Sequence, residues 1–204
     1  YKVGNETYKL SQHGFARDCE FDCVEKTNGF IRFRLIYDEN SLKVYPFKFS
    51  LSISYQLIQN KLNISYTVEN HDSETMPFSI GGHPGFSCPI FEKTKFNEYY
   101  LEFSDYETLS RHYLDQGVFD GKTKLILNNQ NRLLLNHQLF KDDAIIFKQP
   151  KSDSVNLIHQ DQGKVLTVSF PGFEYLGIWA KPDENANFIC IEPWLGLADS
   201  KDFT

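Results

Sequence analysis

The stretch PFSIGGHPGFSCPI, residues Pro77 to Ile90, decides how we interpret the rest of the chain. A short apolar strand, Phe78 to Ile80, leads into two glycines, a histidine and a proline. The two glycines allow backbone angles closed to other residues, and Pro84 pushes His83 towards an extended conformation. A histidine fixed in this way suits proton transfer, because imidazole titrates at a pH of about 6.5. The plainer interpretation is a turn that carries a surface histidine.

The composition favours a β fold. The chain has 204 residues, of which 41% are hydrophobic, so it can bury a substantial core. Its 18 Phe and 11 Tyr residues stand against a single Met. Aromatic side chains suit the pleated, half-buried surface of a sheet, and all-β sandwiches of this length fold as one unit. We find no linker or internal repeat, and therefore predict one domain over residues 1–204.

Two neighbouring segments show the clearest strand pattern. Residues 49–57 (FSLSISYQL) and 61–69 (KLNISYTVE) alternate apolar with polar side chains, and the short link Gln59-Asn60 joins them. This period-2 alternation predicts an antiparallel pair with one face buried and the other wetted by Ser, Thr and Asn.

The remainder of the chain consists of further short apolar runs between turn signals. Single strands are predicted at residues 30–37, 97–103, 145–147, 175–180 and 187–191, and hairpins at 1–10, 124–135 and 154–170. The pair 175–180 and 187–191 is joined by the loop 181–186. No segment has a convincing helical period. Roughly ten short strands at this spacing predict an all-β, large antiparallel β-sandwich.

Several classes of function and location are disfavoured. The net charge is −6 with acids and bases interspersed, so we expect no nucleic acid partner. No apolar run of about 18 residues predicts a membrane span, and no basic-then-apolar leader is visible. The four cysteines lack the spacing of a metal site, so we expect no metal. We interpret them as reduced thiols of a cytoplasmic protein, with a disulfide as the alternative. They are Cys19, Cys23, Cys88 and Cys190.

Glu192, Asp142 and Asp143 are the other candidates for a catalytic or binding role. Glu192 follows the apolar run 188–191, where a glutamate is rare, so it is a candidate general base. It could equally have emerged from the protein at the end of a strand. Trp194 would supply an apolar wall or a stacking face for a sugar ring. Either Asp142 or Asp143 could bind hydroxyls or orient a histidine, although acids at strand starts are common.

A histidine and a carboxylate, each at a strand end in an aromatic-rich sandwich, suit acid–base chemistry on a small polar ligand. We find no nucleophile elbow, phosphate loop or dinucleotide fingerprint. The remaining histidines receive no role in this interpretation; they are His71, His112, His137 and His159.

Three stretches give the chain its resemblance to the galactose mutarotase (aldose 1-epimerase) superfamily. They are QHGFARD at 12–18, SIGGHPGF at 79–86 and IEPWLGLADS at 191–200. The chain is most similar to the short bacterial aldose-epimerase-like branch, and the resemblance covers essentially its whole length. It implies a single-domain supersandwich of about 300 residues, so we expect this chain to lack the N- and C-terminal ends of that fold.

The resemblance also implies a reaction and residue roles. Members interconvert α and β sugar anomers without a metal or cofactor, so the expected partner is a small sugar, and a homodimer is left open. Glu192 matches the base that takes the proton of the C1 hydroxyl, and His83 the acid that protonates the ring oxygen. The substrate-binding matches are His13, Arg17 and Asp143, with Asp142 as the alternative to Asp143, and we add Trp194. Arg17 could meet a phosphate or a hydroxyl.

The resemblance departs from the mutarotase pattern at one point. His83 lies in GGHPGF, where mutarotases have Asn-His followed by an aromatic residue, so the identity of the sugar stays open. Two rival functions fit the same residues. One is a non-catalytic carbohydrate-binding sandwich that stacks sugars on Trp194. The other is a glycoside hydrolase with Glu192 and Asp143 as its two carboxylates, about 5–9.5 Å apart.

Overall fold

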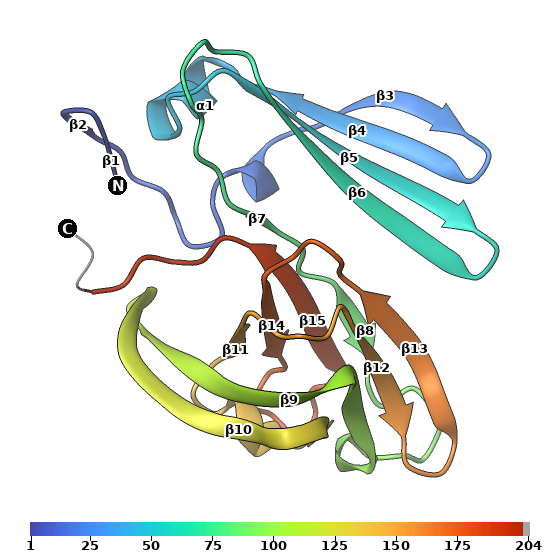
Figure 1. Ribbon diagram of the computed structural model, residues 1–204. Coiled ribbons are helices and arrows are strands. Elements are labelled where there is room, and N and C mark those ends of the chain that lie inside the picture. Colours follow the sequence, from blue (N-terminus) through green and yellow to red (C-terminus); the bar gives the residue numbers. More distant parts are fainter. Residues whose placement is uncertain (202–204) are drawn as a thin grey trace. The chain divides into compact units, whose positions relative to one another are not determined.

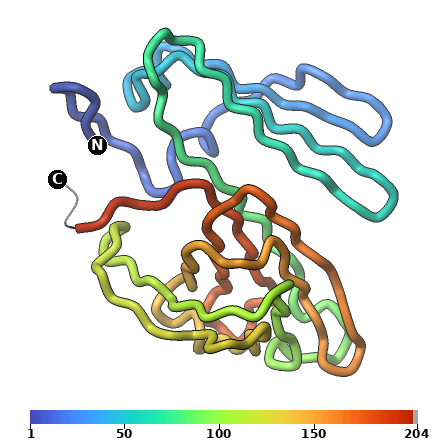
Figure 2. The backbone as a smooth tube through the Cα atoms, viewed as in Figure 1, coloured from blue at the N-terminus to red at the C-terminus, as the bar shows by residue number. Residues whose placement is uncertain are grey.

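The computed structural model describes residues 1–201, and the chain divides into two compact units, Tyr1–Pro77 and the residues from Phe78 onward. Both units consist mainly of antiparallel strands, and the described residues include one short α-helix (Figures 1 and 2). The predicted all-β fold class is therefore confirmed. The prediction of a single domain depends on how the two units are joined, and it stays a prediction.

The first unit contains a four-stranded antiparallel sheet in which each strand pairs with the next. Its strands are β3 (Asp22–Thr27), β4 (Phe30–Ile36), β5 (Phe49–Ile58) and β6 (Lys61–Asn70), after a hairpin of β1 (Lys2–Val3) and β2 (Glu6–Thr7). The predicted pairing of β5 with β6 is confirmed. The predicted burial of one face is wrong at the turn end, where Leu57 and Leu62 are 60% and 58% exposed. The hairpin extends beyond the packed part of the unit, so both of its faces meet solvent there.

Aromatic packing holds the segment that carries two predicted substrate-binding residues. The ring of Phe15 lies 5.7 Å from those of Tyr45 and Phe49. The 3-10 helix η1 (Ala16–Asp18) follows directly. Tyr45 ends the helix α1 (Glu39–Val44), which begins with a capping box on Asp38.

The second unit contains a nine-stranded sheet in which β15 lies between β14 on one side and β7 and β8 on the other. The strands follow the order β13-β12-β9-β11-β14-β15-β7, with β10 paired to β9 and β8 paired to β15. Their bounds are β7 (Ile80–Gly81), β8 (Gly85–Ser87), β9 (Tyr99–Asp115), β10 (Val118–Leu134), β11 (Ile145–Lys148), β12 (Ser154–His159), β13 (Gly163–Ser169), β14 (Tyr175–Trp179) and β15 (Phe188–Leu195).

The predicted hairpin at residues 124–135 is wrong. β9 and β10 are 17-residue strands that pair along their length and curl together (Figure 1). The polar run 128–131, which we predicted to be a turn, continues the strand. Register shifts flank Gln130, and Asn129 has a φ of 51°. Irregularities of this kind absorb extra residues and bend a strand, so turn-forming side chains here produce curvature instead of reversal.

The core of the second unit explains the orientation of its strands. Fully buried side chains include Leu101, Ile145, Ile178, Ile189 and Ile191. Because successive side chains of a strand point to opposite faces, this core fixes which residues of β14 and β15 face away from it. The predicted hairpin of β12 with β13 is confirmed, and the structure pairs β14 antiparallel with β15.

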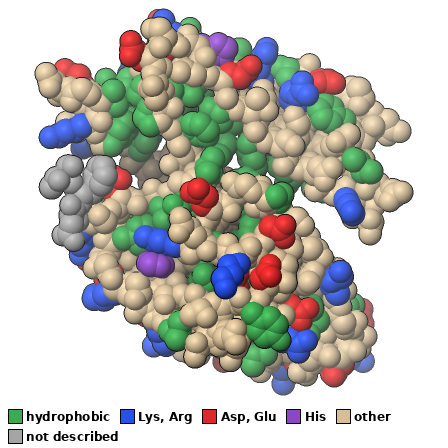
Figure 3. Space-filling view, in the orientation of Figure 1, with side chains coloured by type: hydrophobic (Ala, Val, Ile, Leu, Met, Phe, Trp, Pro, Cys, Tyr) green, Lys and Arg blue, Asp and Glu red, His purple; other side chains and the backbone are tan. Residues whose placement is uncertain are grey.

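Three further observations concern the predicted class and location. All four cysteines are free, and none of the described helices is long and apolar enough to span a membrane. Basic and acidic side chains are interspersed on the face shown in Figure 3. The absence of a nucleic acid partner and the cytoplasmic location stay predictions.

Candidate active site

Strand β15 carries the carboxylate at the centre of the site. Ile189 and Ile191 are 0% exposed and belong to the core, so Cys190 and Glu192 share the opposite face of the strand. That face is covered too, because Cys190 is 4% and Glu192 is 3% exposed. Carboxylates are almost never buried this deeply without a partner. The interpretation of Glu192 as a residue that has simply emerged from the protein is therefore wrong.

Backbone hydrogen bonds hold His83 alongside the same strand. β7 and β8 both pair with β15, and His83 lies in the short link between them. On one side of His83, the Gly82 N–H donates to the Pro193 carbonyl over 3.0 Å; on the other, the Ile191 N–H donates to the Pro84 carbonyl over 3.3 Å. The position on β15 between these two bonds is residue 192, so His83 is held opposite it.

The two side chains meet as a pair. His83 Nε2 lies 3.4 Å from Glu192 Oε1. The carboxylate is buried, whereas the imidazole is 49% exposed and can therefore reach both Glu192 and a ligand from solvent. The ring of His83 also lies edge-on to Trp179, with 6.2 Å between the ring centroids.

The glycines beside this pair make room for an indole ring. Gly81 and Gly82 do not use the backbone freedom that glycine allows, because neither residue has a positive φ. A Cβ at Gly81 would lie 2.5 Å from Trp194 Cδ1, and a Cβ at Gly177 would lie 2.5 Å from Trp194 Cζ2. Gly81 and Gly177 lie on the strands that flank β15, so the indole of Trp194 extends over both neighbours. Space, not backbone freedom, requires glycine at these two positions.

Burial sets the electrostatics of Glu192. It raises the pKa of the carboxyl group to about 7, because the charged form loses its hydration. A hydrogen-bonding interaction with the Trp194 side chain opposes this shift, and the negative charge of Asp143 adds to it. Both protonation states of Glu192 are therefore accessible near neutral pH, as a group that takes up and returns a proton requires.

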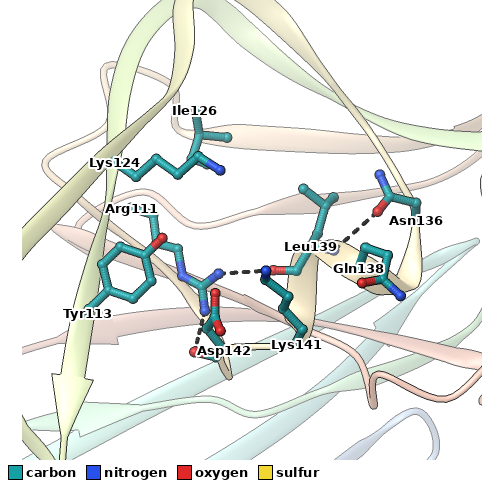
Figure 4. A pocket seen from close by; sticks show the side chains of 9 residues that line it. All are labelled: Arg111, Tyr113, Lys124, Ile126, Asn136, Gln138, Leu139, Lys141 and Asp142. Carbon is teal, nitrogen blue, oxygen red and sulfur yellow. Dashed lines mark hydrogen bonds between the residues drawn. The ribbon is translucent and has the colours of Figure 1, made fainter.

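The influence of Asp143 on Glu192 distinguishes it from its neighbour Asp142. Asp143 has a φ of 76°, in the left-handed region that aspartate tolerates better than most residues. The buried guanidinium of Arg111 donates to the carbonyl oxygens of Leu139 and Asp142 (Figure 4). It also donates to the carbonyl oxygen of Asp143, and thereby holds the turn. Asp142 lines a separate cavity beside Arg111 and Lys141 (Figure 4). Of the two acids we therefore keep Asp143 for the site.

His13 and Arg17 lie in the first unit. His13 has a φ of 69°, and Arg17 lies in η1, where its Nε is 3.8 Å from Asp18 Oδ1. The side chain of Arg17 is 61% exposed, so a ligand from solvent can reach it. Because the other four predicted site residues lie in the second unit, the roles of His13 and Arg17 stay predictions.

Four residues received no role in our sequence interpretation: Cys190, Trp179 and Gly177, which lie beside the pair, and Arg111, which holds the turn of Asp143. Cys190 could have been found, because it precedes Glu192 by two residues on a strand and must share its face. Arg111 is two residues after the buried Leu109 on β9, which also indicates an inward side chain. Trp179 and Gly177 depend on the pairing of β14 with β15, and the local sequence carries no sign of their position beside His83 and Trp194.

One group of described residues could hold a metal ion. The ligand atoms of His83, Cys190 and Glu192 all lie within 4.8 Å of one another. This group differs from our prediction of no metal site, which we based on the spacing of the cysteines. That spacing could not indicate the group, because only one of its three ligands is a cysteine.

The fold agrees with comparisons to known proteins. The chain belongs to the aldose 1-epimerase family, whose model matches residues 1–201. The curated protein LacX (plasmid) of Lactococcus lactis subsp. lactis is 35% identical over 195 residues. These residues make up 94% of this chain, and the chain spans only 65% of the length of that relative.

Two solved structures are similar over nearly the whole chain. One is a galactose mutarotase related enzyme from Lactobacillus acidophilus, with 35% identity and a TM-score of 0.92 over all of this chain and 68% of that one. The other is a galactose mutarotase-like protein from Lactobacillus casei, with 33% identity and a TM-score of 0.87 over 98% of this chain and 69% of that one. The predicted resemblance to the galactose mutarotase superfamily is thus confirmed.

Proposed function

We propose that the protein is an isomerase of the aldose 1-epimerase type, which interconverts the α and β anomers of a hexose or related sugar. The observation that carries this proposal is the 3.4 Å distance between His83 Nε2 and Glu192 Oε1. Ring opening needs one group that accepts the proton of the C1 hydroxyl and another that protonates the ring oxygen. Both oxygens are bonded to C1, so the two groups must lie close together, as this pair does.

The proposed reaction is a reversible proton exchange. The Glu192 carboxylate accepts the proton of the C1 hydroxyl as protonated His83 donates to the ring oxygen, the bond from C1 to the ring oxygen breaks, and a C1 carbonyl forms. Rotation about the bond from C1 to C2 presents the other face of the carbonyl. The hydroxyl formed from the former ring oxygen then attacks C1 and returns its proton to His83. The carbonyl oxygen on C1 takes the proton back from Glu192.

Both groups are required for this exchange. A base acting alone would leave the departing ring oxygen as an alkoxide, whereas a paired donor and acceptor avoid separated charge. Each positioned proton transfer typically contributes about 10²–10⁴-fold in rate. The raised pKa of Glu192 supports its role, since a base whose pKa lies near the working pH transfers protons most efficiently.

The remaining predicted residues would bind the sugar. Asp143 would accept hydrogen bonds from sugar hydroxyls, and the indole of Trp194, on the same strand as Glu192, would offer an apolar surface. His13 would bind a hydroxyl, and Arg17 a hydroxyl or a phosphate. No step in this scheme uses a metal or organic cofactor, and the free cysteines support the predicted cytoplasmic location.

The test is NMR saturation exchange between anomers, run on a panel of free and 6-phosphorylated aldoses with and without the protein. We expect accelerated exchange for at least one sugar in the panel. Binding without acceleration would contradict the proposal and favour a carbohydrate-binding protein. Release of product from a glycoside, with no acceleration for the free sugar, would favour a hydrolase instead.

A further inference from the structure

The group His83, Cys190 and Glu192 combines three different kinds of metal ligand at one point. It offers an imidazole nitrogen, a thiol sulfur and a carboxylate oxygen, all within 4.8 Å of one another. The nitrogen and the oxygen are 3.4 Å apart. Cys190 takes no part in the proposed proton exchange, so its presence beside the acid–base pair calls for a separate explanation.

The fold holds these ligands in place without help from a metal. Cys190 and Glu192 are two residues apart on β15 and share one face, and the backbone hydrogen bonds on either side of His83 hold it against that face. Cys190 and Glu192 are nearly buried, which restricts their movement. His83 is 49% exposed, so an ion can reach the group from solvent.

The separations fit a tetrahedral zinc ion. Zinc binds cysteine sulfur at about 2.3 Å and histidine nitrogen or carboxylate oxygen at about 2.0–2.2 Å, which places neighbouring ligand atoms about 3.3–3.7 Å apart. The distance between His83 and Glu192 already lies in this range, and the sulfur lies at most 4.8 Å from either. A shift of about 1 Å in one side chain completes three corners of a tetrahedron and leaves the fourth open to water.

The chemistry of the ligands selects the kind of ion. A thiolate and an imidazole favour Zn²⁺ over Mg²⁺ or Ca²⁺, which prefer oxygen ligands alone. The nearby charge of Asp143, which acts on Glu192, also attracts a cation. On binding, the S–H bond of Cys190 breaks and its proton leaves to solvent, and a protonated His83 likewise releases its proton, so no oxidant or reductant is needed.

We propose that His83, Cys190 and Glu192 form a Zn²⁺ site that reversibly switches off sugar binding and catalysis. The inhibitory part of this inference rests on the proposed function. Zinc occupies the imidazole lone pair and the carboxylate oxygen that proton exchange requires, so zinc and sugar exclude each other. Zinc therefore acts as a competitive inhibitor, and a chelator restores activity.

Metal binding is tested without any activity measurement. Protein stripped with a chelator is titrated with Co²⁺, whose thiolate charge-transfer and tetrahedral ligand-field absorption report a Cys ligand directly, and Zn²⁺ is then added to displace it. We expect one ion per chain in the wild type, loss of the charge-transfer absorption in Cys190→Ala, and at least tenfold weaker binding in that variant. Cys23→Ala, which removes an exposed cysteine elsewhere, is the matched control and keeps the wild-type spectrum.

The inhibition is tested in parallel by anomer exchange with increasing Zn²⁺, each variant measured against its own zinc-free rate. We expect at least a tenfold higher inhibitory concentration in Cys190→Ala than in Cys23→Ala. Equal inhibition, or a cobalt spectrum without the thiolate band, would overturn the proposal. If Cys190→Ala does not fold, Cys190→Ser replaces it in the cobalt titration. His83→Gln, a substitution at a half-exposed position, is titrated alongside it. A cobalt signal in a protein that has no exchange activity would contradict the proposed function but not the metal site. Anomer exchange that zinc does not inhibit would contradict this inference but not the proposed function.

Discussion

At the scale of single residues, the chemistry depends on a carboxylate kept away from water. Glu192 is 3% exposed, and burial raises its pKa to about 7. A carboxylate with an ordinary pKa would be a weak base, since it holds a proton poorly at neutral pH. Burial on β15 makes Glu192 a stronger base, and the adjacent imidazole supplies the complementary acid.

The pH profile tests this interpretation of Glu192. The base works only when deprotonated, so kcat/KM should be low in acid and rise with pH through about 7, because kcat/KM reports the free enzyme. In Asp143→Asn the charge that helps to raise the pKa is gone. The rising limb should therefore move to lower pH in that variant.

The control for the pH profile is Asp142→Asn, which removes the neighbouring charge beside the separate cavity. Its rising limb should stay at the wild-type pH. An equal shift in both variants, or no shift in Asp143→Asn, would contradict the assignment of Asp143 to the site.

Sequence alone identified the pair His83 and Glu192 because each occupies a conspicuous local context, a GGHPGF turn and an acid after an apolar strand. It gave the wrong reason for the glycine at position 81, whose role depends on the indole of Trp194 across a strand pairing. Contacts of this kind join residues more than a hundred positions apart, and no local pattern records them.

At the scale of elements, β15 and its neighbours form the platform of the site. Gly177 on β14 is the sharpest test, because a Cβ there would lie 2.5 Å from Trp194 Cζ2 and 2.8 Å from Cη2. Gly177→Ala must displace the indole, and overpacking of this kind typically costs about 1–3 kcal/mol. We expect that loss in chemical unfolding, together with a lower kcat/KM.

Gly85→Ala is the matched control, since its Cβ would lie at an ordinary 3.6 Å from Cys190 Sγ. It should change the free energy of unfolding by less than about 1 kcal/mol. If both alanine variants behave alike, the space filled by Trp194 is not what requires glycine on β14.

The turn that presents Asp143 depends on β9. Arg111 is 4% exposed and donates to three carbonyl oxygens of residues 139–143. Arg111→Met removes all three bonds and should lower the free energy of unfolding by about 1–3 kcal/mol. Urea denaturation measures this loss.

Arg132→Met serves for comparison, because Arg132 forms an exposed ion pair with Glu102 at 2.9 Å. Exposed pairs contribute about 0–1 kcal/mol, so this variant should lose little. An equal loss in both variants would show that Arg111 does not hold the turn as described.

The longest strands show where pattern reading fails at this scale. The alternating segments β5 and β6 were predicted almost to the residue, whereas β10 was divided into two strands because Asn128-Asn129-Gln130-Asn131 resembles a turn. Turn chemistry and a bulge use the same residue types, and only the long pairing with β9 decides between them.

At the scale of the whole molecule, the predicted site residues are divided between two compact units. His83, Asp143, Glu192 and Trp194 belong to the second unit, so proton exchange should depend on that unit. His13 belongs to the first unit, and we predict that it contributes to sugar binding. His13→Ala should raise KM about 3- to 10-fold with a smaller change in kcat, as expected for one lost hydrogen bond.

Steady-state kinetics by polarimetry separates these two effects. The exposed His71→Ala, which lies in the same unit and has no predicted role, is the control and should leave KM unchanged. A fall in kcat without a rise in KM in His13→Ala would assign His13 to the chemical step and contradict the division of roles between the units.

The most direct test of the account is the anomer exchange rate of His83→Ala and Glu192→Gln, measured by NMR on the full-length protein with the sugar that the wild type uses best. Thermal unfolding establishes first that both variants fold; above pH 7 Glu192→Gln should be at least as stable as the wild type, because it removes a buried carboxylate. We predict that each substitution lowers the rate by at least about 100-fold. A wild-type rate in either folded variant would contradict the claim that this imidazole and this carboxylate exchange protons with the sugar.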